Sequence, residues 1–289
     1  MDTALELRIA FDRGNIKNLE QGQNLLRDSD LVRNLTTSFE RKPLCAIWRI
    51  IALSEIPYAY TMDYTNHVIK YIEKHLSTPS GFSLTGKEAG LLPCYNAMLI
   101  EAFSKLGRAE TPTVQNAVEW IKKFQPFERN TAALWPGIGV KKYGGCLRAT
   151  PCFIGVAKSI KALVAYDEAT GHQDIQIASL ILKGMDYILK HELYKRLSNG
   201  EPINNHILDL AFPASYQLNV VELLDLAYTT GNMKHAACQS ALDFVKSKKT
   251  KDGYWKINYV YKSEGYVAFD QRGKKADWLT YLLDRCFAY

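Results

Sequence analysis

Long apolar runs are missing from this chain of 289 residues. Its most apolar segments are interrupted by Lys158, Lys161, Glu222 or Asp225, so none reaches the roughly 18 consecutive apolar residues of a membrane span. A strong excess of one charge is missing as well. The 36 lysine and arginine residues are nearly matched by 30 acidic residues, and the net charge of +6 is too small to indicate nucleic-acid binding. We therefore expect neither a membrane span nor a nucleic-acid partner.

The first residues lack a basic segment followed by an apolar one, so we expect no export signal and a cytoplasmic location. Cysteine is scarce. Six cysteines in a chain of this length are not a disulfide framework, which is typical of short secreted domains. They should be free thiols that fill the core, act chemically or bind a metal. The sequence also has no phosphate-cradling glycine loop, no Ser-His-Asp spacing and no haem motif.

A repeat is the main feature that the sequence does contain. Five segments share one plan: a proline or turn, a small or aromatic residue, and then about three turns of apolar residues at helical spacing. Corresponding positions in these segments are residues 45, 94, 152, 216 and 276, which lie 49, 58, 64 and 60 residues apart. This separation leaves room for a second helix in each unit.

The second helices are predicted over 67–75, 114–124, 179–189 and 238–245, where apolar residues form one-sided stripes. The first helix of each unit is apolar on more than one face and should be more buried. Before residue 40 the only helical pattern is a weak one over 19–32. We predict an all-α fold of about five to six helical hairpins in two layers, forming one domain over 1–289. Periodicity alone leaves open whether the hairpins form an open solenoid or a closed ring.

Several motifs resemble the terpenoid cyclase and protein prenyltransferase α/α-toroid superfamily. They are Leu92 to Met98, the pair Cys146 and Cys152, and the turn Asp252 to Trp255. Within it the chain resembles small prokaryotic prenyltransferase-like or squalene-cyclase-like proteins. The resemblance implies a closed α/α toroid with inner and outer helices.

The chain departs from these relatives at two positions. They have a histidine where this chain has Phe153, and an acidic residue where it has Asn219. A family activity that depends on either position is lost or changed here. The Asp-x-Asp-Asp acid motif of class II terpene cyclases is absent, which disfavours protonation-initiated cyclisation.

Three cysteines are candidates for chemistry. Pro93 and Pro151 suit the first position of a helix, which would place Cys94 and Cys152 in the first turn. In a toroid the parallel inner helices would bring both thiols to one mouth, close to Cys146. Helix N-termini lower thiol pKa values, and thiolates bind zinc or act as nucleophiles. We therefore consider Cys94, Cys146 and Cys152 as zinc ligands, with Cys146 and Cys152 also as catalytic residues. The alternative is that these thiols only fill the core.

Aromatic residues stand near the starts of the predicted inner helices. Tyr95, Phe153, Tyr216 and Trp278 would suit an isoprenoid chain or a carbocation if they line a cavity. At helical spacing they could equally belong to the core. We treat them as candidate substrate-binding residues.

Charged residues supply the remaining candidates. Glu222 interrupts an apolar helix, so it either faces the cavity as an acid or pairs with a base. Arg148, beside Cys146, could contact a diphosphate or be solvated. His191 ends an outer helix, where a cation favours the helix C-terminus.

Together these observations predict a toroid whose central cavity binds a mainly apolar small molecule such as an isoprenoid. If it is an enzyme, the reaction would be cyclisation, prenyl transfer or a lyase step at a cysteine or zinc mouth. The alternative is a non-catalytic binding or scaffold protein, in which the toroid is packed shut.

Overall fold

The computed structural model describes residues 1–131 and 151–288, most of which are helical. In chain order the helices are α1 (Thr3–Asp12), α2 (Leu19–Asp28), α3 (Asp30–Thr36), α4 (Pro43–Ser54), α5 (Asp63–His75), α6 (Pro93–Lys105), α7 (Pro112–Phe124), α9 (Phe153–Thr170), α10 (Ile175–Lys190), α11 (Val220–Thr229), α12 (Gln239–Ser247) and α13 (Asp277–Phe287). Short 3-10 turns cover Ala59–Thr61, Glu88–Gly90 and Ala236–Cys238. Strands β1 (Ser77–Thr78) and β2 (Gly81–Phe82) form an antiparallel hairpin, with Ser77 opposite Phe82.

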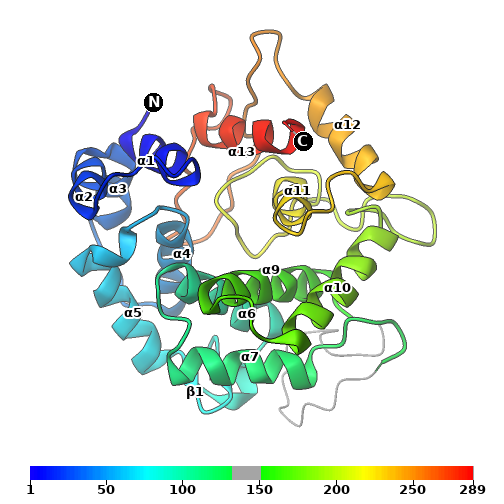
Figure 1. The fold of residues 1–289 in the computed structure, drawn as a ribbon, viewed down its shortest axis with the longest axis horizontal. Helices are drawn as coiled ribbons and strands as arrows, with labels where there is room; N and C mark the ends of the chain where they lie inside the picture. Colours follow the sequence, from blue (N-terminus) through cyan, green and yellow to red (C-terminus); the bar gives the residue numbers. More distant parts are fainter. Residues whose placement is uncertain (132–150, 289) are drawn as a thin grey trace.

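The predicted pairs of helices are present. Helices α4, α6, α9, α11 and α13 lie nearest the middle of the molecule, while α5, α7, α10 and α12 lie around them (Figure 1). In α6 every residue from Pro93 to Ser104 is buried. By contrast, α7 buries one stripe that includes Val114, Val118 and Ile121. The all-α prediction and the difference in burial between the two sets of helices are confirmed.

Local sequence signals explain where these helices start. Pro43, Pro93 and Pro112 occupy the first positions of α4, α6 and α7, where their missing N–H groups would have no helical partner. The side chain of Asp174 caps α10 by accepting from the N–H groups of Gln176 and Ile177.

Two predicted helix starts were wrong. Helix α9 begins at Phe153, and Cys152 is its extended N-cap residue rather than part of the first turn. Helix α11 begins at Val220, so Tyr216 lies in the segment before it. The start of α11 is set by Asn219, whose side chain accepts a hydrogen bond of 3.0 Å from the N–H of Glu222.

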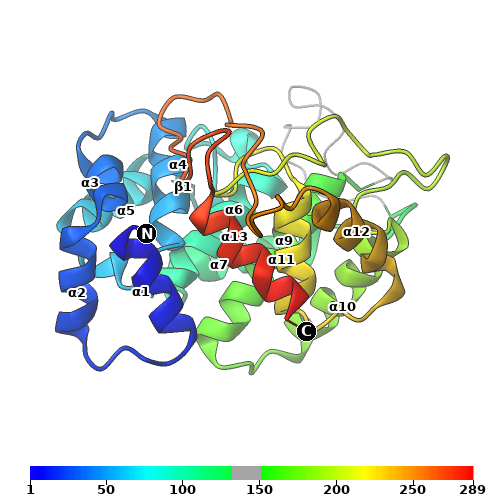
Figure 2. The same cartoon turned by 90° about the horizontal axis from the view of Figure 1, so that it is seen from above.

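The first and last helices lie side by side (Figures 1 and 2). The Tyr281 hydroxyl of α13 donates a hydrogen bond of 2.7 Å to Asp12 of α1. Arg285 pairs with the same carboxylate at 3.3 Å. The sequence did not predict α1, yet this short helix brings the first part of the chain into contact with the last helix, α13.

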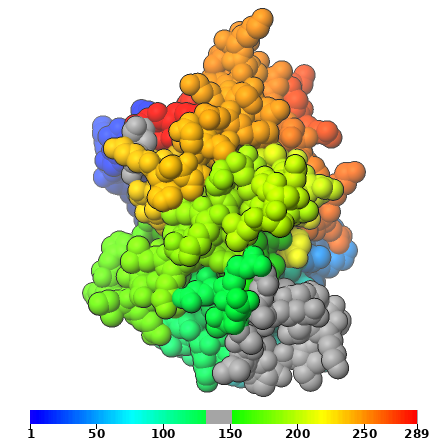
Figure 3. Space-filling model, turned by 90° about the vertical axis from the view of Figure 1, so that its right-hand side faces the viewer, coloured from blue at the N-terminus to red at the C-terminus, as the bar shows by residue number. Residues whose placement is uncertain are grey.

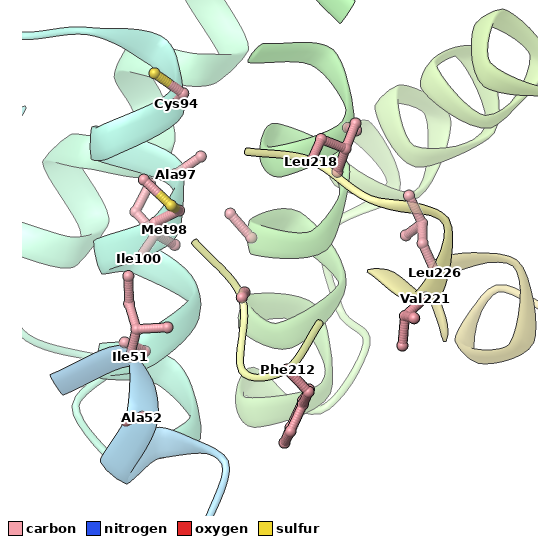
Figure 4. Close-up of a cluster of buried hydrophobic side chains, with 14 of the residues drawn as sticks. Ile51, Ala52, Cys94, Ala97, Met98, Ile100, Phe212, Leu218, Val221 and Leu226 are labelled. Carbon is pink, nitrogen blue, oxygen red and sulfur yellow. The ribbon is translucent and has the colours of Figure 1, made fainter. Parts of the chain in front are cut away.

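The apolar core runs between the inner helices. Side chains from α4, α6 and α11, including Ile51, Met98 and Val221, pack with Phe212 and Leu218 of the segment before α11 (Figure 4). No helix among the described residues is both long and apolar enough to cross a membrane.

Packing between α9 and α10 depends on Gly184. A β-carbon added at Gly184 would lie 2.6 Å from Cγ1 of the buried Ile160, whereas one added at Gly155 would meet nothing closer than 3.5 Å. Gly155 lies in the first turn of α9 and Gly184 in the interior of α10, where alanine gains the full helix propensity, so a greater loss of stability at Gly184 reports the steric clash. We expect Gly184→Ala to be less stable than Gly155→Ala by about 1–3 kcal/mol. Urea unfolding of both variants measures this difference, and equal stabilities would contradict the packing described.

Candidate functional site

The starts of α6 and α9 lie together, as predicted for the cysteine mouth. A β-carbon added at Gly155 would lie 3.5 Å from Cβ of Pro93 and 3.7 Å from Cβ of Cys152. Cys94 is buried in the first turn of α6, and Cys152 is partly exposed. Cys146 and Arg148 lie outside the described residues. Within residues 1–131 and 151–288, no group of three or more His, Cys, Asp or Glu side chains could hold a metal ion.

The predicted activation of the Cys94 thiol is wrong. Burial raises the pKa of Cys94 to about 12, and the nearby Cys152 acts in the same direction. Hydrogen bonding to the N–H of Tyr95 and the charge of Lys158 lower this pKa by less. Desolvation therefore outweighs the favourable helix N-terminus. Cys94 also belongs to the apolar cluster of Figure 4, as expected for a packing residue.

The predicted aromatic wall is divided between three places. Tyr95 and Tyr216 stack on each other with ring centroids 5.8 Å apart. Trp278 is buried elsewhere, between Phe212 and Phe269.

Phe153 lies against α10, where it contacts two aromatic rings. Its ring centroid is 5.2 Å from that of His191 and 6.2 Å from that of Tyr187. The structure therefore brings together only two of the four predicted substrate-binding residues.

Glu222 pairs with two lysines of α9. Its Oε1 accepts hydrogen bonds from Lys158 and, at 3.2 Å, from Lys161. The ammonium group of Lys158 also donates to the carbonyl oxygen of Ser215 at 2.8 Å. Lys161 pairs in turn with Glu101 of α6 at 3.3 Å. Of the two roles considered for Glu222, a cavity acid or the partner of a base, the structure shows pairing with bases.

The chain of ion pairs continues from Glu101 to α1. Lys105 pairs with Glu101 at 2.7 Å and with Glu55, which follows α4, at 2.8 Å. Glu55 pairs with Arg8 of α1 at 3.5 Å, and Arg8 pairs with Asp12 at 2.9 Å. Each link alternates a base with an acid.

Helix α13 closes the path. Arg285 pairs with Asp12 at 3.3 Å and with Asp225 at 2.8 Å. Asp225 lies one helical turn after Glu222 on α11, so the path begins and ends on neighbouring acids of the same helix. We call this set the central ion-pair circuit. Its five basic and five acidic members are Arg8, Lys105, Lys158, Lys161, Arg285, Asp12, Glu55, Glu101, Glu222 and Asp225.

Mutual pairing controls the charges of the central ion-pair circuit. Burial raises the pKa of Glu101, but Lys105 and Lys161 together bring it down to about 2. Burial lowers the pKa of Lys161, yet Glu101 and Glu222 raise it well above its usual value. The pKa of fully buried Lys158 is lowered because burial outweighs its carboxylate partner.

The circuit leaves little space at the centre. A cavity of about 20 Å³ is lined by polar and apolar groups that include Glu55, Lys161, Glu222 and Asp225. Oε2 of Glu222 is buried there without a protein partner. A space of this size, bordered by polar groups, suits one water molecule.

Larger hollows lie at the outer end of α10. Two adjoining hollows of about 350 and 470 Å³ share Arg129, Tyr187, His191 and Leu197, and Phe153 lines the second. The segments that carry these residues meet on the face seen in Figure 3. Sequence reasoning treated His191 as a charged helix cap. Burial instead lowers its pKa and favours the neutral ring. The available signal was the spacing of four between Tyr187 and His191, which places both on one side of a helical turn.

No protein-family model matches this chain, and no curated protein sequence matches it. The resemblance to the toroid superfamily therefore depends on the motifs and on the order of the helices.

Removing Glu222 should unbalance the central ion-pair circuit. In Glu222→Gln the buried ammonium groups of Lys158 and Lys161 lose their shared carboxylate, and loss of one partner from a buried pair costs about 3–5 kcal/mol. The matched control is Asp284→Asn on α13, whose exposed pair with Lys249 is worth about 0.2–1 kcal/mol. Denaturant unfolding measures both free energies. Equal losses in the two variants would show that the circuit does not hold the inner helices together.

Proposed function

We propose that this chain is an α/α toroid of the terpenoid cyclase and prenyltransferase type, whose centre is packed shut. Support comes from the alternation of inner and outer helices and from the contact between α1 and α13. The motifs at Cys94 and at Asp252 to Trp255 agree with this proposal.

We further propose that the protein binds a partly apolar small molecule at its outer face rather than at its centre. One observation carries this proposal: the central cavity measures about 20 Å³, whereas the hollows at the end of α10 measure about 350 and 470 Å³ and have mainly apolar walls. Two other hollows, of about 400 and 540 Å³, have more polar walls. Small-molecule pockets typically span about 300–1,000 Å³. An isoprenoid chain would therefore fit beside Phe153 and not among the charges of the central ion-pair circuit.

A ligand at the outer face would not be enclosed by the protein, and this excludes one of the reactions considered. Cyclisation of an isoprenoid requires a chamber that encloses the substrate and excludes water, and the cavity beside Glu222 and Lys161, at about 20 Å³, is too small to be one. The proposed role is therefore binding, with an apolar or isoprenoid-like ligand. The scaffold alternative, a toroid with no small-molecule ligand, is the competing outcome of the following experiment.

Filling the hollow should displace the ligand. Ser198 lines the larger hollow and is exposed, so a tryptophan there occupies the space without disturbing the core. We expect native mass spectrometry of gently purified wild type to detect a bound apolar molecule that Ser198→Trp loses. The control Ser247→Trp, at the exposed end of α12, should keep it. A wild type without ligand would favour the scaffold, and retention in Ser198→Trp would place the ligand elsewhere.

Zinc at the cysteine mouth stays a prediction. Cys94 and Cys152 would supply two sulfurs, and zinc binding would have to deprotonate the buried Cys94 thiol. We expect elemental analysis of protein purified without a histidine tag to find near-stoichiometric zinc that disappears in Cys94→Ser and in Cys152→Ser. Cys238→Ser, in a buried cysteine remote from the mouth, is the control. Wild type without metal would remove zinc from the proposal.

A further inference from the structure

The His191 ring has an acceptor nitrogen that no group in residues 1–131 or 151–288 uses. Its Nδ1 lies 2.8 Å from the carbonyl oxygen of Lys195, which can only accept, so Nδ1 carries the proton. The unprotonated Nε2 is buried and has no hydrogen-bond partner. The side chain as a whole is 7% exposed and lines both hollows. Buried polar groups normally have partners, so this acceptor points to a ligand that donates a hydrogen bond.

The backbone after His191 holds the ring in place at a conformational cost. Glu192 and Leu193 have φ values of 43° and 65°, in the left-handed region that residues with side chains rarely adopt. Leu193 is fully buried, and the N–H of Lys195 donates to the carbonyl oxygen of His191 at 2.6 Å. Strain of this kind persists where the surrounding structure fixes it, often at functional sites.

Arg129 supplies a cation at the same place, and no acid among the described residues pairs with it. The other bases around the hollows are engaged: Lys183 pairs with Glu128 at 3.8 Å, and Lys190 pairs with Asp186 at 2.5 Å. In the described part of the chain Arg129 has no ion pair. Its charge is nevertheless close enough to lower the pKa values of both Tyr187 and His191. At Tyr187 it opposes the larger effect of burial, and at His191 it adds to it.

Arg196, the remaining base, donates to the carbonyl oxygen of Ile203 at 3.1 Å. Apolar groups complete the larger hollow beyond it, with Phe153, Leu197 and Ile203 in its wall. The same space therefore offers a cation, a hydrogen-bond acceptor and apolar surface beside them.

We infer that Arg129 and His191 recognise the head group of an amphiphilic anion, a carboxylate with an adjacent hydroxyl or N–H, while Phe153 and Leu197 contact its apolar chain. Arg129 donates to the carboxylate, and Nε2 of His191 accepts from the neighbouring hydroxyl. This inference rests on the proposed binding function and specifies the class of ligand.

Three probes separate the contributions of the head group. 2-Hydroxyoctanoate carries both polar groups, octanoate lacks the hydroxyl, and 1-octanol lacks the carboxylate. By calorimetric titration we expect wild type to bind 2-hydroxyoctanoate about tenfold more tightly than octanoate. Octanoate should bind about tenfold more tightly than 1-octanol. Arg129→Gln should remove the second preference and leave the binding of 1-octanol unchanged.

Two substitutions of His191 test its acceptor directly. In His191→Asn the amide nitrogen takes the place of Nδ1 and preserves the bond to Lys195, but no atom replaces Nε2. In His191→Gln the amide reaches the place of Nε2. The preference for the hydroxyl should be lost in His191→Asn and partly restored in His191→Gln. Its persistence in His191→Asn, or equal binding of all three probes, would overturn this inference alone. Failure of every probe to bind would overturn the proposed function as well.

Discussion

A charge removed from water must find a partner, and this requirement fixes the middle of the molecule. Isolated burial of a carboxylate or an ammonium group costs several kcal/mol. The central ion-pair circuit avoids this cost by matching acids and bases from six successive parts of the chain, from α1 to α13. Apolar packing tolerates small rotations of a helix, whereas each link of the circuit requires particular atoms to meet. The inner helices are therefore held in one relative arrangement.

Because the circuit occupies the middle of the molecule, the proposed binding site lies away from it. The paired charges of the circuit border a central cavity of about 20 Å³, which has room for about one water molecule. The hollows near the end of α10 have room for a small molecule, and they border Nε2 of His191 and the guanidinium of Arg129. Among the described residues, that nitrogen has no hydrogen-bond partner and Arg129 has no ion pair. Polar groups that the fold does not use for itself are the ones available to a ligand.

The helical pairs could be predicted because their signals are local: prolines at helix starts, and apolar residues at helical spacing over many turns. Helix α1 was missed because only Ala4, Leu5 and Leu7 are buried in it, too few to stand out as a stripe. The circuit was beyond sequence reasoning for another reason. Nothing in the sequence shows that Asp12 meets a residue 273 positions away. The cysteine prediction failed in its electrostatics, because burial of Cys94 depends on neighbours that only the fold assembles.

The link between α1 and α13 sets an order of events during synthesis. Pairs such as α4 with α5, and α6 with α7, join helices that are neighbours in the sequence, so they can form as they leave the ribosome. Asp12, however, is made well before its partners Tyr281 and Arg285, which follow it by 269 and 273 residues. Until they arrive, Asp12 and Asp225 must remain hydrated, and water keeps access to the centre. The contacts that join α13 to α1 can therefore form only after α13 has been synthesised.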